Sequence, residues 1–315
     1  MSLRHRASAE RGQAIVLVVA VLAVLIGIAA LVIDGGSWLR AQRHLQTAAD
    51  AAALAGAQNL PTDQSGASSM AISYAQQNFP GIPAPTVTFP DAGTIDVAAQ
   101  TTAPGFLAKI YGSAFSNVTI RAHARAQVSV PASMKNVAPV AVKNTVACAA
   151  TNPGCYGQTV TLVFDESQVA SSTIGLIDLT CHSTQSNACA STAGIGGSQL
   201  ESWIENGFAD PLPANQWYGV KTGETVGPVK HGFEQTVGTP LFFPVFDQVT
   251  NTGSQYFFHV IGWAAFVIHS GGITWGPQGR QLVGHFTTYI ATDLAAGGPI
   301  GGATDFGVHT ITLIQ

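Results

Sequence analysis

The apolar positions of the chain are concentrated in one long run near its start. Residues 14–33, AIVLVVAVLAVLIGIAALVI, include no charged side chain. At a helical rise of about 1.5 Å per residue, such a run extends roughly 30 Å, the thickness of the hydrocarbon part of a bilayer. The pattern predicts an uncleaved membrane-spanning helix. A cleaved signal peptide is the alternative, although its apolar region is usually about 7 to 15 residues long and ends at a small-residue cleavage site.

A second helical pattern, rich in Ala and Gly, follows the apolar run. Asp34 is expected to cap the exit from the membrane, and Gly35 and Gly36 are expected to break or bend the helix. Ser37 is the expected N-cap of a second helix that runs to Leu60. At 100° per residue, one face of this second helix carries mostly small side chains. This candidate packing face consists of Trp38, Leu45, Ala49, Ala52 and Gly56.

The opposite face of the second helix is polar. Asp50 lies there with Arg43 and Thr47, so the pattern assigns Asp50 neither to the membrane interior nor to catalysis. A face of small side chains allows another helix or a sheet to approach closely. The packing face is therefore expected to contact either a partner protein or the protein's own sheet.

The rest of the chain shows mainly strand-like alternation. A helical pattern covers residues 68–79, and strand patterns cover residues 85–90, 94–100 and 117–130. In the last of these strands every second residue is apolar, and His123 is expected on the solvent face. Residues 34–130 are thus expected to hold the Ala-rich helix and a small α/β part.

Two prolines near residue 131 mark a change of composition, where we place a domain boundary. Residues 131–315 are expected to form a β-rich domain in which residues 198–208 are the one convincing helix. The apolar stretch 255–269 is too short for a helical membrane span and is expected to be a buried strand. The predicted fold class is α+β, with a transmembrane helix and an Ala-rich helix before the β-rich domain.

Charge predicts the orientation and excludes one class of partner. Only 10% of the residues are charged and the net charge is -4, so the clustered Lys and Arg of a nucleic-acid surface are missing. Arg4, Arg6 and Arg11 precede the apolar run. Since basic residues stay on the cytoplasmic side, residues 1–13 are expected in the cytoplasm and the large C-terminal part outside it. The expected location is the cytoplasmic membrane, crossed once, with the lipid bilayer as one partner.

The four cysteines indicate disulfides. Cys148, Cys155, Cys181 and Cys189 all lie in the part expected outside the cytoplasm, where an even, clustered set is typical of disulfide bonds. Four cysteines allow three pairings, and we favour the local one, 148 with 155 and 181 with 189. The spacings are wider than those of usual zinc sites, and free thiols remain the alternative if the orientation is reversed.

Motifs of catalysis and cofactor binding are missing from the chain. It has no G-x-S-x-G, no phosphate-binding loop and no H-E-x-x-H, so we expect no catalytic residue, no cofactor and no small-molecule substrate. Asp165 and Ser167 match the first two positions of the D-x-S-x-S metal motif, but Val169 stands where the second Ser is required. The histidines outside the first domain have no ligand-like spacing: His182, His231, His259, His269, His285 and His309.

The order RGQAIVLVV … LVIDGGSWLRAQRHLQTAADAAALAGAQNL resembles the N-terminal region of TadE/TadG-like proteins of Tad (tight adherence, Flp) pilus assembly. In that family an Arg-Gly start precedes one transmembrane helix that ends in Asp-Gly, and an Ala-rich helix follows. The matching residues are Arg11, Gly12, Asp34, Gly35, Leu45, Gln46, Ala48, Asp50, Ala51, Ala52, Ala53, Leu54 and Ala55.

The resemblance implies a non-catalytic, membrane-anchored component of Tad pilus assembly or anchoring, similar to a minor pilin, with other Tad components or pilins as partners. Two departures limit what is carried over. Larger members have an integrin-type metal domain, and the segment DESQV of this chain does not match the motif of that domain. Pilin-like relatives have Glu five residues after the Gly at which they are processed, whereas this chain has Leu17 five residues after Gly12. The alternatives are an anchored cell-surface adhesin or binding domain and a membrane-tethered hydrolase.

Overall fold

The fold is known from a computed structural model that describes residues 7–112, 116–165, 168–186, 195–221, 226–252, 255–276, 279–292 and 294–314. The chain divides into two compact units. Unit 1 comprises Met1–Ala126 and Leu313–Gln315, and unit 2 comprises Gln127–Thr312. The large apolar core, built around Phe and Leu side chains, lies in unit 2.

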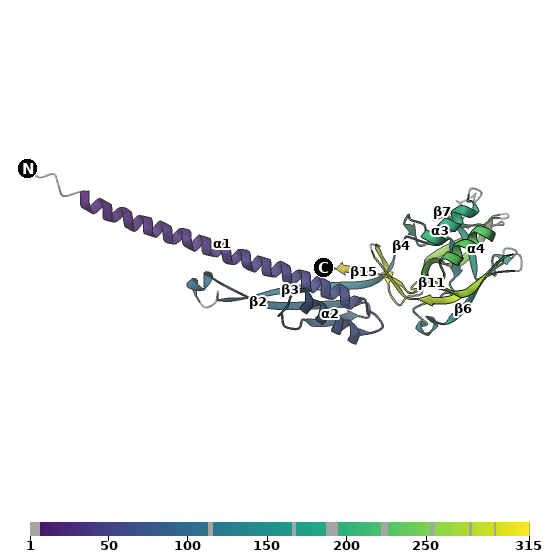
Figure 1. Ribbon diagram of the computed structural model, residues 1–315, viewed down its shortest axis with the longest axis horizontal. Coiled ribbons are helices and arrows are strands. Elements are labelled where there is room, and N and C mark those ends of the chain that lie inside the picture. The colour runs from purple at the N-terminus through teal and green to yellow at the C-terminus, as the bar shows by residue number, and fades with distance from the viewer. Residues whose placement is uncertain are drawn as a thin grey trace, which may run out of the picture. The chain divides into compact units, whose positions relative to one another are not determined.

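Unit 1 begins with one very long helix. Helix α1 (Ala7–Ala57) runs for 51 residues without a break and is drawn in purple in Figure 1. At about 1.5 Å per residue it extends roughly 75 Å, more than twice the thickness of a bilayer's hydrocarbon layer. The predicted break at Gly35 and Gly36 is therefore wrong, and the two predicted helices are one.

The helix continues through Gly35 and Gly36 because glycine weakens a helix without removing a hydrogen bond. A helical Gly costs about 1 kcal/mol relative to Ala, whereas Pro costs about 3 kcal/mol. Ser37 is correspondingly not an N-cap. Its Oγ donates a hydrogen bond to the Asp34 carbonyl, 2.8 Å away within the same helix.

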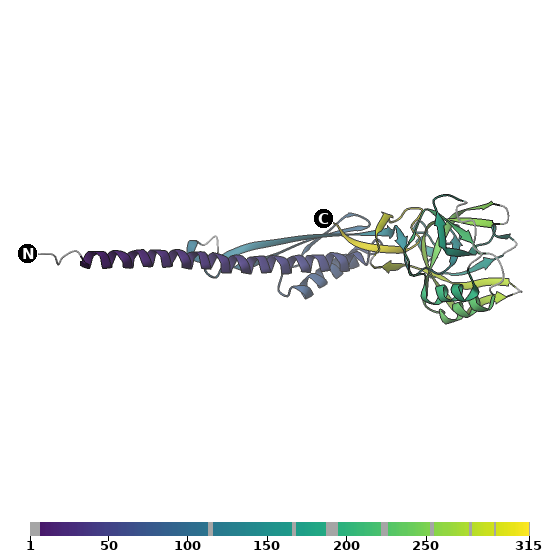
Figure 2. The ribbon, with the colours of Figure 1, turned by 90° about the horizontal axis from the view of Figure 1, so that it is seen from above.

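The rest of unit 1 packs beside the C-terminal half of α1, as both views show (Figures 1 and 2). Helix α2 (Gln64–Asn78) is N-capped by Asp63, whose Oδ1 accepts a hydrogen bond from the Gly66 N–H at 2.7 Å. Ala67, Ala71 and Ala75 form its buried face. The predicted strands appear as β1 (Thr86–Asp91), β2 (Thr94–Pro104) and β3 (Asn117–Pro131), with the short 3₁₀ helix η1 (Ala108–Tyr111) between the last two.

Strands β1, β2 and β3 are neighbours in this order, and β1 pairs antiparallel with β2. From Ile120 to Val128 β3 buries every second residue, as its alternating sequence predicts, and the residues from Val128 to Pro131 are all buried. The tail of β3 continues into unit 2.

Unit 2 is dominated by strands. In chain order they are β4 (Ser133–Met134), β5 (Val140–Lys143), β6 (Thr159–Phe164), β7 (Ile174–Ser183), β8 (Leu212–Pro213), β9 (Gln216–Val220), β10 (Pro240–Thr252), β11 (Gln255–Gly276), β12 (Gly279–Thr287), β13 (Tyr289–Ala291), β14 (Ala296–Pro299) and β15 (Val308–Ile314). The stretch expected as a buried strand is the first two thirds of β11. The β-rich prediction for this part of the chain is confirmed.

The central strands of unit 2 close on themselves. Their order is β10-β5-β7-β9-β11, and β10 also pairs with β11, which completes a ring of five strands. Strands β12 and β6 extend from β11. Closure leaves the ring without an open edge, where another chain could add a strand. Phe246 on β10 and Phe258 on β11 stack at 4.0 Å between ring centroids within the core.

Two helices, α3 (Gly197–Asn206) and α4 (Val226–Gln235), lie side by side in unit 2 (Figures 1 and 2). The sequence predicts α3, which buries Leu200, Trp203 and Ile204. It does not predict α4, because VGPVKHGFEQ contains two Gly and one Pro. Pro228 is tolerated because it lies in the first turn of α4, where the backbone N–H would have no intrahelical partner.

Candidate functional site

The first half of α1 presents apolar side chains that nothing in the described part of the chain covers. Large side chains between Ile15 and Ile33 are exposed by 50% to 70%. Within the described residues, α1 is the one helix long and apolar enough to cross a membrane. Length, composition and exposure together fit a membrane anchor.

The second half of α1 is buried within unit 1. Leu45, Ala49 and Ala52 of the candidate packing face have no exposed surface. Gly56 lies so close to its neighbours that an added Cβ would stand 2.5 Å from Ile95 Cδ1 on β2 and 2.9 Å from the Ala67 carbonyl oxygen on α2. The small residues therefore admit the chain's own helix and sheet. Of the two contacts left open by the sequence, the structure contains the internal one.

The burial extends beyond the face drawn from the helical wheel. Ala48 and Ala53 are also fully buried, while Trp38 is only half-buried. The indole Nε1–H of Trp38 donates to the Pro104 carbonyl at 3.3 Å, at the end of β2. Trp38 thus attaches α1 to the sheet at its rim, and the close packing lies further along the helix.

Asp34 is the buried polar centre of unit 1. Its side chain has no exposed surface. Its Oδ1 accepts from the Phe106 N–H at 3.1 Å, and its Oδ2 accepts from the N–H groups of Leu107 at 2.9 Å and Ala108 at 2.5 Å. These three donors stand at the start of η1 and have no partner in a preceding turn, so the carboxylate acts as a cap supplied by a distant helix. The predicted position of Asp34 at the exit from the membrane stays a prediction, and α1 itself continues past Asp34.

Gln46 and Asp50 connect α1 to β3. Gln46 Nε2 donates to Asp50 Oδ1 and to the His123 carbonyl, both at 2.8 Å. The two residues are one helical turn apart, so their side chains meet on one face. Asp50 is accordingly half-buried and bonded, although the sequence indicates only a polar, outward position.

His123 lies on the solvent face of β3, as predicted, with 57% of its side chain exposed. Its Nε2 pairs with Asp96 of β2, which also forms an ion pair with Arg125 at 2.5 Å. The opposite charges lie across two neighbouring strands, an arrangement that stabilises a sheet. His123 is part of a surface ion-pair network.

Unit 2 contains a disulfide between Cys148 and Cys155, with the two Cα atoms 5.7 Å apart. This is one of the two local pairings that the sequence favours. The other pairing stays a prediction, because Cys189 lies outside the described residues. Tyr156, next to Cys155 of the disulfide, lies directly against Gly307. Burial, and to a lesser extent the nearby Asp305 charge, raises the pKa of the Tyr156 hydroxyl.

Asp305 is the buried carboxylate of unit 2. It accepts from the Gly301 N–H at 2.7 Å, the Gly307 N–H at 3.0 Å and His309 Nε2 at 2.8 Å. Burial alone would raise the pKa of Asp305, but the His309 hydrogen bond and charge and the two backbone N–H groups lower it overall. Gly307 has a φ of 85°, a conformation that glycine adopts without strain.

The segment that partly matches a metal motif has another arrangement. Asp165 follows β6, and its backbone N–H donates to Ser172 Oγ at 2.8 Å. Val169 is buried in the core and offers no oxygen. Ser167 lies outside the described residues.

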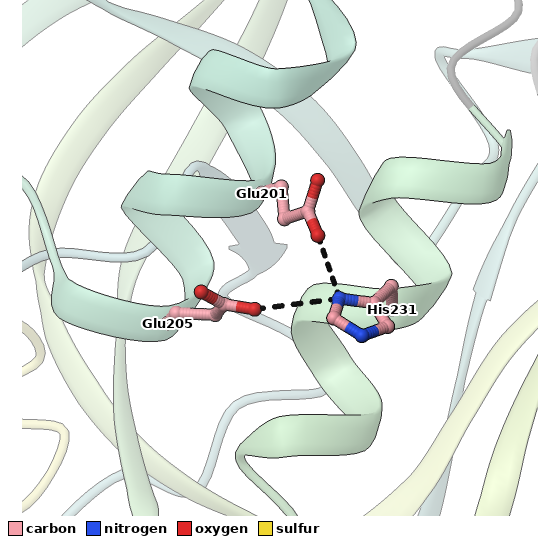
Figure 3. A group of neighbouring side chains, drawn as sticks. All are labelled: Glu201, Glu205 and His231. Atoms are coloured by element: carbon pink, nitrogen blue, oxygen red, sulfur yellow. Dashed lines mark hydrogen bonds and ion pairs between the residues drawn. The ribbon is translucent and has the colours of Figure 1, made fainter.

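A cluster that the sequence does not predict lies on α3 and α4. Glu201, Glu205 and His231 direct their side chains toward one another (Figure 3), and among the described residues they form the one group of three whose ligand atoms lie within 4.8 Å of one another. The E-x₃-E spacing on α3 was visible in the sequence. His231 was not connected to it, because α4 was not predicted.

Comparison with known proteins bears on the N-terminal part of the chain. Residues 12–59 match the family model described as putative Flp pilus-assembly TadE/G-like. Neither the curated proteins nor the solved structures gave a match. The matched residues cover α1 from Gly12 to its end, including Asp34, Gln46, Asp50 and the packing face. The predicted resemblance to this family is confirmed over those residues.

Proposed function

We propose that the protein is a non-catalytic, membrane-anchored component of Tad/Flp-type pilus assembly or anchoring, similar to a minor pilin. The observation that supports this most is the family match at residues 12–59, which falls on a helix that is exposed and apolar in one half and buried in the other. The exposed half supplies the anchor. The buried half joins that anchor to the sheet of unit 1.

The proposed orientation has the N-terminus in the cytoplasm, residues 14–33 in the membrane, and the rest of unit 1 and unit 2 outside the cytoplasm. Arg4, Arg6 and Arg11 before the apolar run support it by the positive-inside rule. The disulfide of unit 2 supports it independently, because disulfides persist in oxidising compartments outside the cytoplasm.

The internal packing of Ala49, Ala52 and Gly56 changes which surface is available to a pilus partner. A partner must contact α1 in the membrane or the outside of the two units. Within the span, Ala23 and Gly27 line a shallow apolar hollow. At 100° per residue Ala20 lies near the same face, and small residues let membrane helices approach closely.

The test of this contact compares two substitutions of the same kind. Gly27→Leu fills the hollow, whereas Ala29→Leu adds a similar side chain about 160° away around the helix. Both variants should reach the membrane at wild-type level, since Gly27 lines the open hollow and Ala29 is exposed. Gly27→Leu should lose co-isolation with other pilus components after mild detergent extraction, and Ala29→Leu should keep it.

Equal co-isolation by both variants would contradict the contact through Gly27. The adhesin alternative predicts a different result, in which unit 2 attaches cells to a surface without any pilus component. Cells that lack all pilus genes but carry this protein should then still attach.

A further inference from the structure

We propose that Glu201, Glu205 and His231 bind one divalent metal ion of the zinc class on the surface of unit 2. Figure 3 shows two carboxylates from α3 and the imidazole from α4 pointing at a common space. His231 Nδ1 is 2.6 Å from Glu201 Oε1 and 3.5 Å from Glu205 Oε1. The inference is separate from the pilus role proposed above and stands on these residues alone.

The two helices hold the three side chains on a close-packed scaffold. An added Cβ at Gly232, next to His231, would stand 3.2 Å from both the Glu201 carbonyl oxygen and Ile204 Cβ. At the other end of the pair, an added Cβ at Gly197 would stand 2.9 Å from Pro228 Cγ. Glycine at both points lets α3 and α4 approach closely. The ligands therefore project from rigid elements, as a metal site requires.

The distances suit a small ion. Two ligand atoms bound tetrahedrally to zinc at about 2.0–2.2 Å lie roughly 3.4 Å from each other. The 3.5 Å separation between His231 Nδ1 and Glu205 Oε1 matches that value, whereas Glu201 Oε1, at 2.6 Å, lies at hydrogen-bond distance and moves outward by less than about 1 Å to admit the ion. The side chains of Glu201, Glu205 and His231 are 27%, 30% and 56% exposed, so small rotations can admit the ion and water can complete its coordination.

The charge of the cluster favours a cation. Glu201 and Glu205 are one helical turn apart, where two like charges destabilise a helix. The nearest basic residue in sequence, Lys230, pairs with Glu234 at 3.6 Å instead. A neutral His231 leaves two negative charges side by side, and a divalent ion neutralises both.

The donor types indicate which metal binds. Imidazole suits zinc and its neighbours in the transition series, whereas Mg²⁺ and Ca²⁺ prefer sites made of oxygen alone. A metal on His231 Nδ1 requires the proton on Nε2, and that N–H then needs an acceptor. Gln235 lies one turn further along α4 with its amide nitrogen 3.4 Å from Nε2, and the opposite amide orientation presents the required oxygen.

A surface ion pair between His231 and Glu201 is the alternative explanation of the same geometry. It uses Glu201 at 2.6 Å and gains little from Glu205 at 3.5 Å. Metal binding, in contrast, needs both carboxylates. Glu205→Gln therefore separates the two explanations, because it leaves the Glu201–His231 contact in place.

The experiment is a Zn²⁺ titration of the purified full-length chain in detergent, after removal of metal with a chelator. Wild type is compared with Glu205→Gln and His231→Gln. Glu234→Gln is the matched control, since it removes an exposed carboxylate of α4 outside the cluster. Wild type and the control should bind one more zinc ion per chain than the two cluster variants, and the affinity of that ion should fall at least tenfold in each variant.

Zinc should also raise the melting temperature of wild type and of the control, and this shift should be lost in the variants. Mg²⁺ at the same concentration should produce no such shift. Identical zinc binding by wild type and Glu205→Gln, or no saturable binding by wild type, would overturn the site. Equal affinity for Mg²⁺ would overturn the role of the imidazole.

Discussion

Asp34 is a carboxylate of unit 1 with no exposed surface. It follows the apolar run 14–33 directly, and its carboxylate accepts hydrogen bonds from three backbone N–H groups of the segment before and within η1. The end of the apolar run is thus hydrogen-bonded to a loop more than seventy residues later in the chain. Asp34 thus joins the apolar half of α1 to the folded part of unit 1.

Asp34→Ala should therefore destabilise unit 1 strongly, because it leaves one buried and two partly buried N–H groups without an acceptor. Asp63→Ala is the matched control, since Asp63 makes one such bond at an exposed N-cap, where the loss is typically about 1 kcal/mol. Limited proteolysis of the detergent-solubilised chain measures both. Equal protease resistance of the two variants would show that Asp34 contributes no more to stability than the single N-cap bond of Asp63.

The buried carboxylate of Asp305 should make the stability of unit 2 depend on pH. Its folded-state pKa lies below the ordinary value of 3.8, so its contribution to stability is present above about pH 4 and is lost as the pH falls through the lowered value. Melting temperatures of wild type should therefore change little between pH 6 and about pH 4 and drop steeply below that. In Asp305→Asn they should start lower and change less with pH, and parallel curves would contradict this assignment.

For the N-terminal site, the sequence predicts which residues share a helical face but not which residues they contact. Local spacing places Trp38, Leu45 and Gly56 on one helical face, since that relation depends only on residues of one helix. The partners of Asp34 could not be predicted, because the donors Phe106 and Leu107 become its neighbours only after the sheet has formed. The Glu201–His231 contact was missed for the same reason.

At the scale of elements, α1 combines two environments in one helix. The surroundings of its glycine residues differ accordingly between the two halves of the helix. An added Cβ at Gly36 meets nothing within 4 Å, while one at Gly56 stands 2.5 Å from Ile95 Cδ1 and 2.9 Å from the Ala67 carbonyl oxygen. The two positions carry the same residue for different reasons.

Gly56→Ala should therefore cost about 1–3 kcal/mol of unfolding free energy, because the methyl group forces the backbone of α2 or the side chain of Ile95 to move. Gly36→Ala should be neutral or gain up to about 1 kcal/mol from helix propensity. Chemical unfolding of the two variants in detergent gives both values. Destabilisation by Gly36→Ala as large as by Gly56→Ala would disprove the difference.

Element types could be predicted wherever the periodicity is strong, as in β3 and α3. The wrong or missing helix predictions lie at Gly and Pro residues, where local propensity predicts that a helix ends or does not form. Gly35 and Gly36 do not end α1, since a long helix with good formers on both sides outweighs two weak positions. Helix α4 forms although it contains Gly227, Pro228 and Gly232, because packing against α3 needs the close approach that a glycine allows.

At the scale of the whole molecule, the class of each part could be predicted but not the way in which its strands join. Period-two patterns predict strands, but the closure of β10-β5-β7-β9-β11 depends on pairings between distant segments. Local patterns also do not predict that the chain returns to unit 1 at Leu313. What the sequence predicts best is the segment at residues 14–33, where composition alone decides the environment.

The central claim is that this anchored chain takes part in assembling or anchoring a Tad-type pilus, and it is tested most directly by counting pili. Electron microscopy should compare wild-type cells, cells in which the gene is deleted and deleted cells that express the full-length chain. The account predicts few or no pili after deletion and normal numbers after re-expression. Normal piliation of the deleted cells would contradict it.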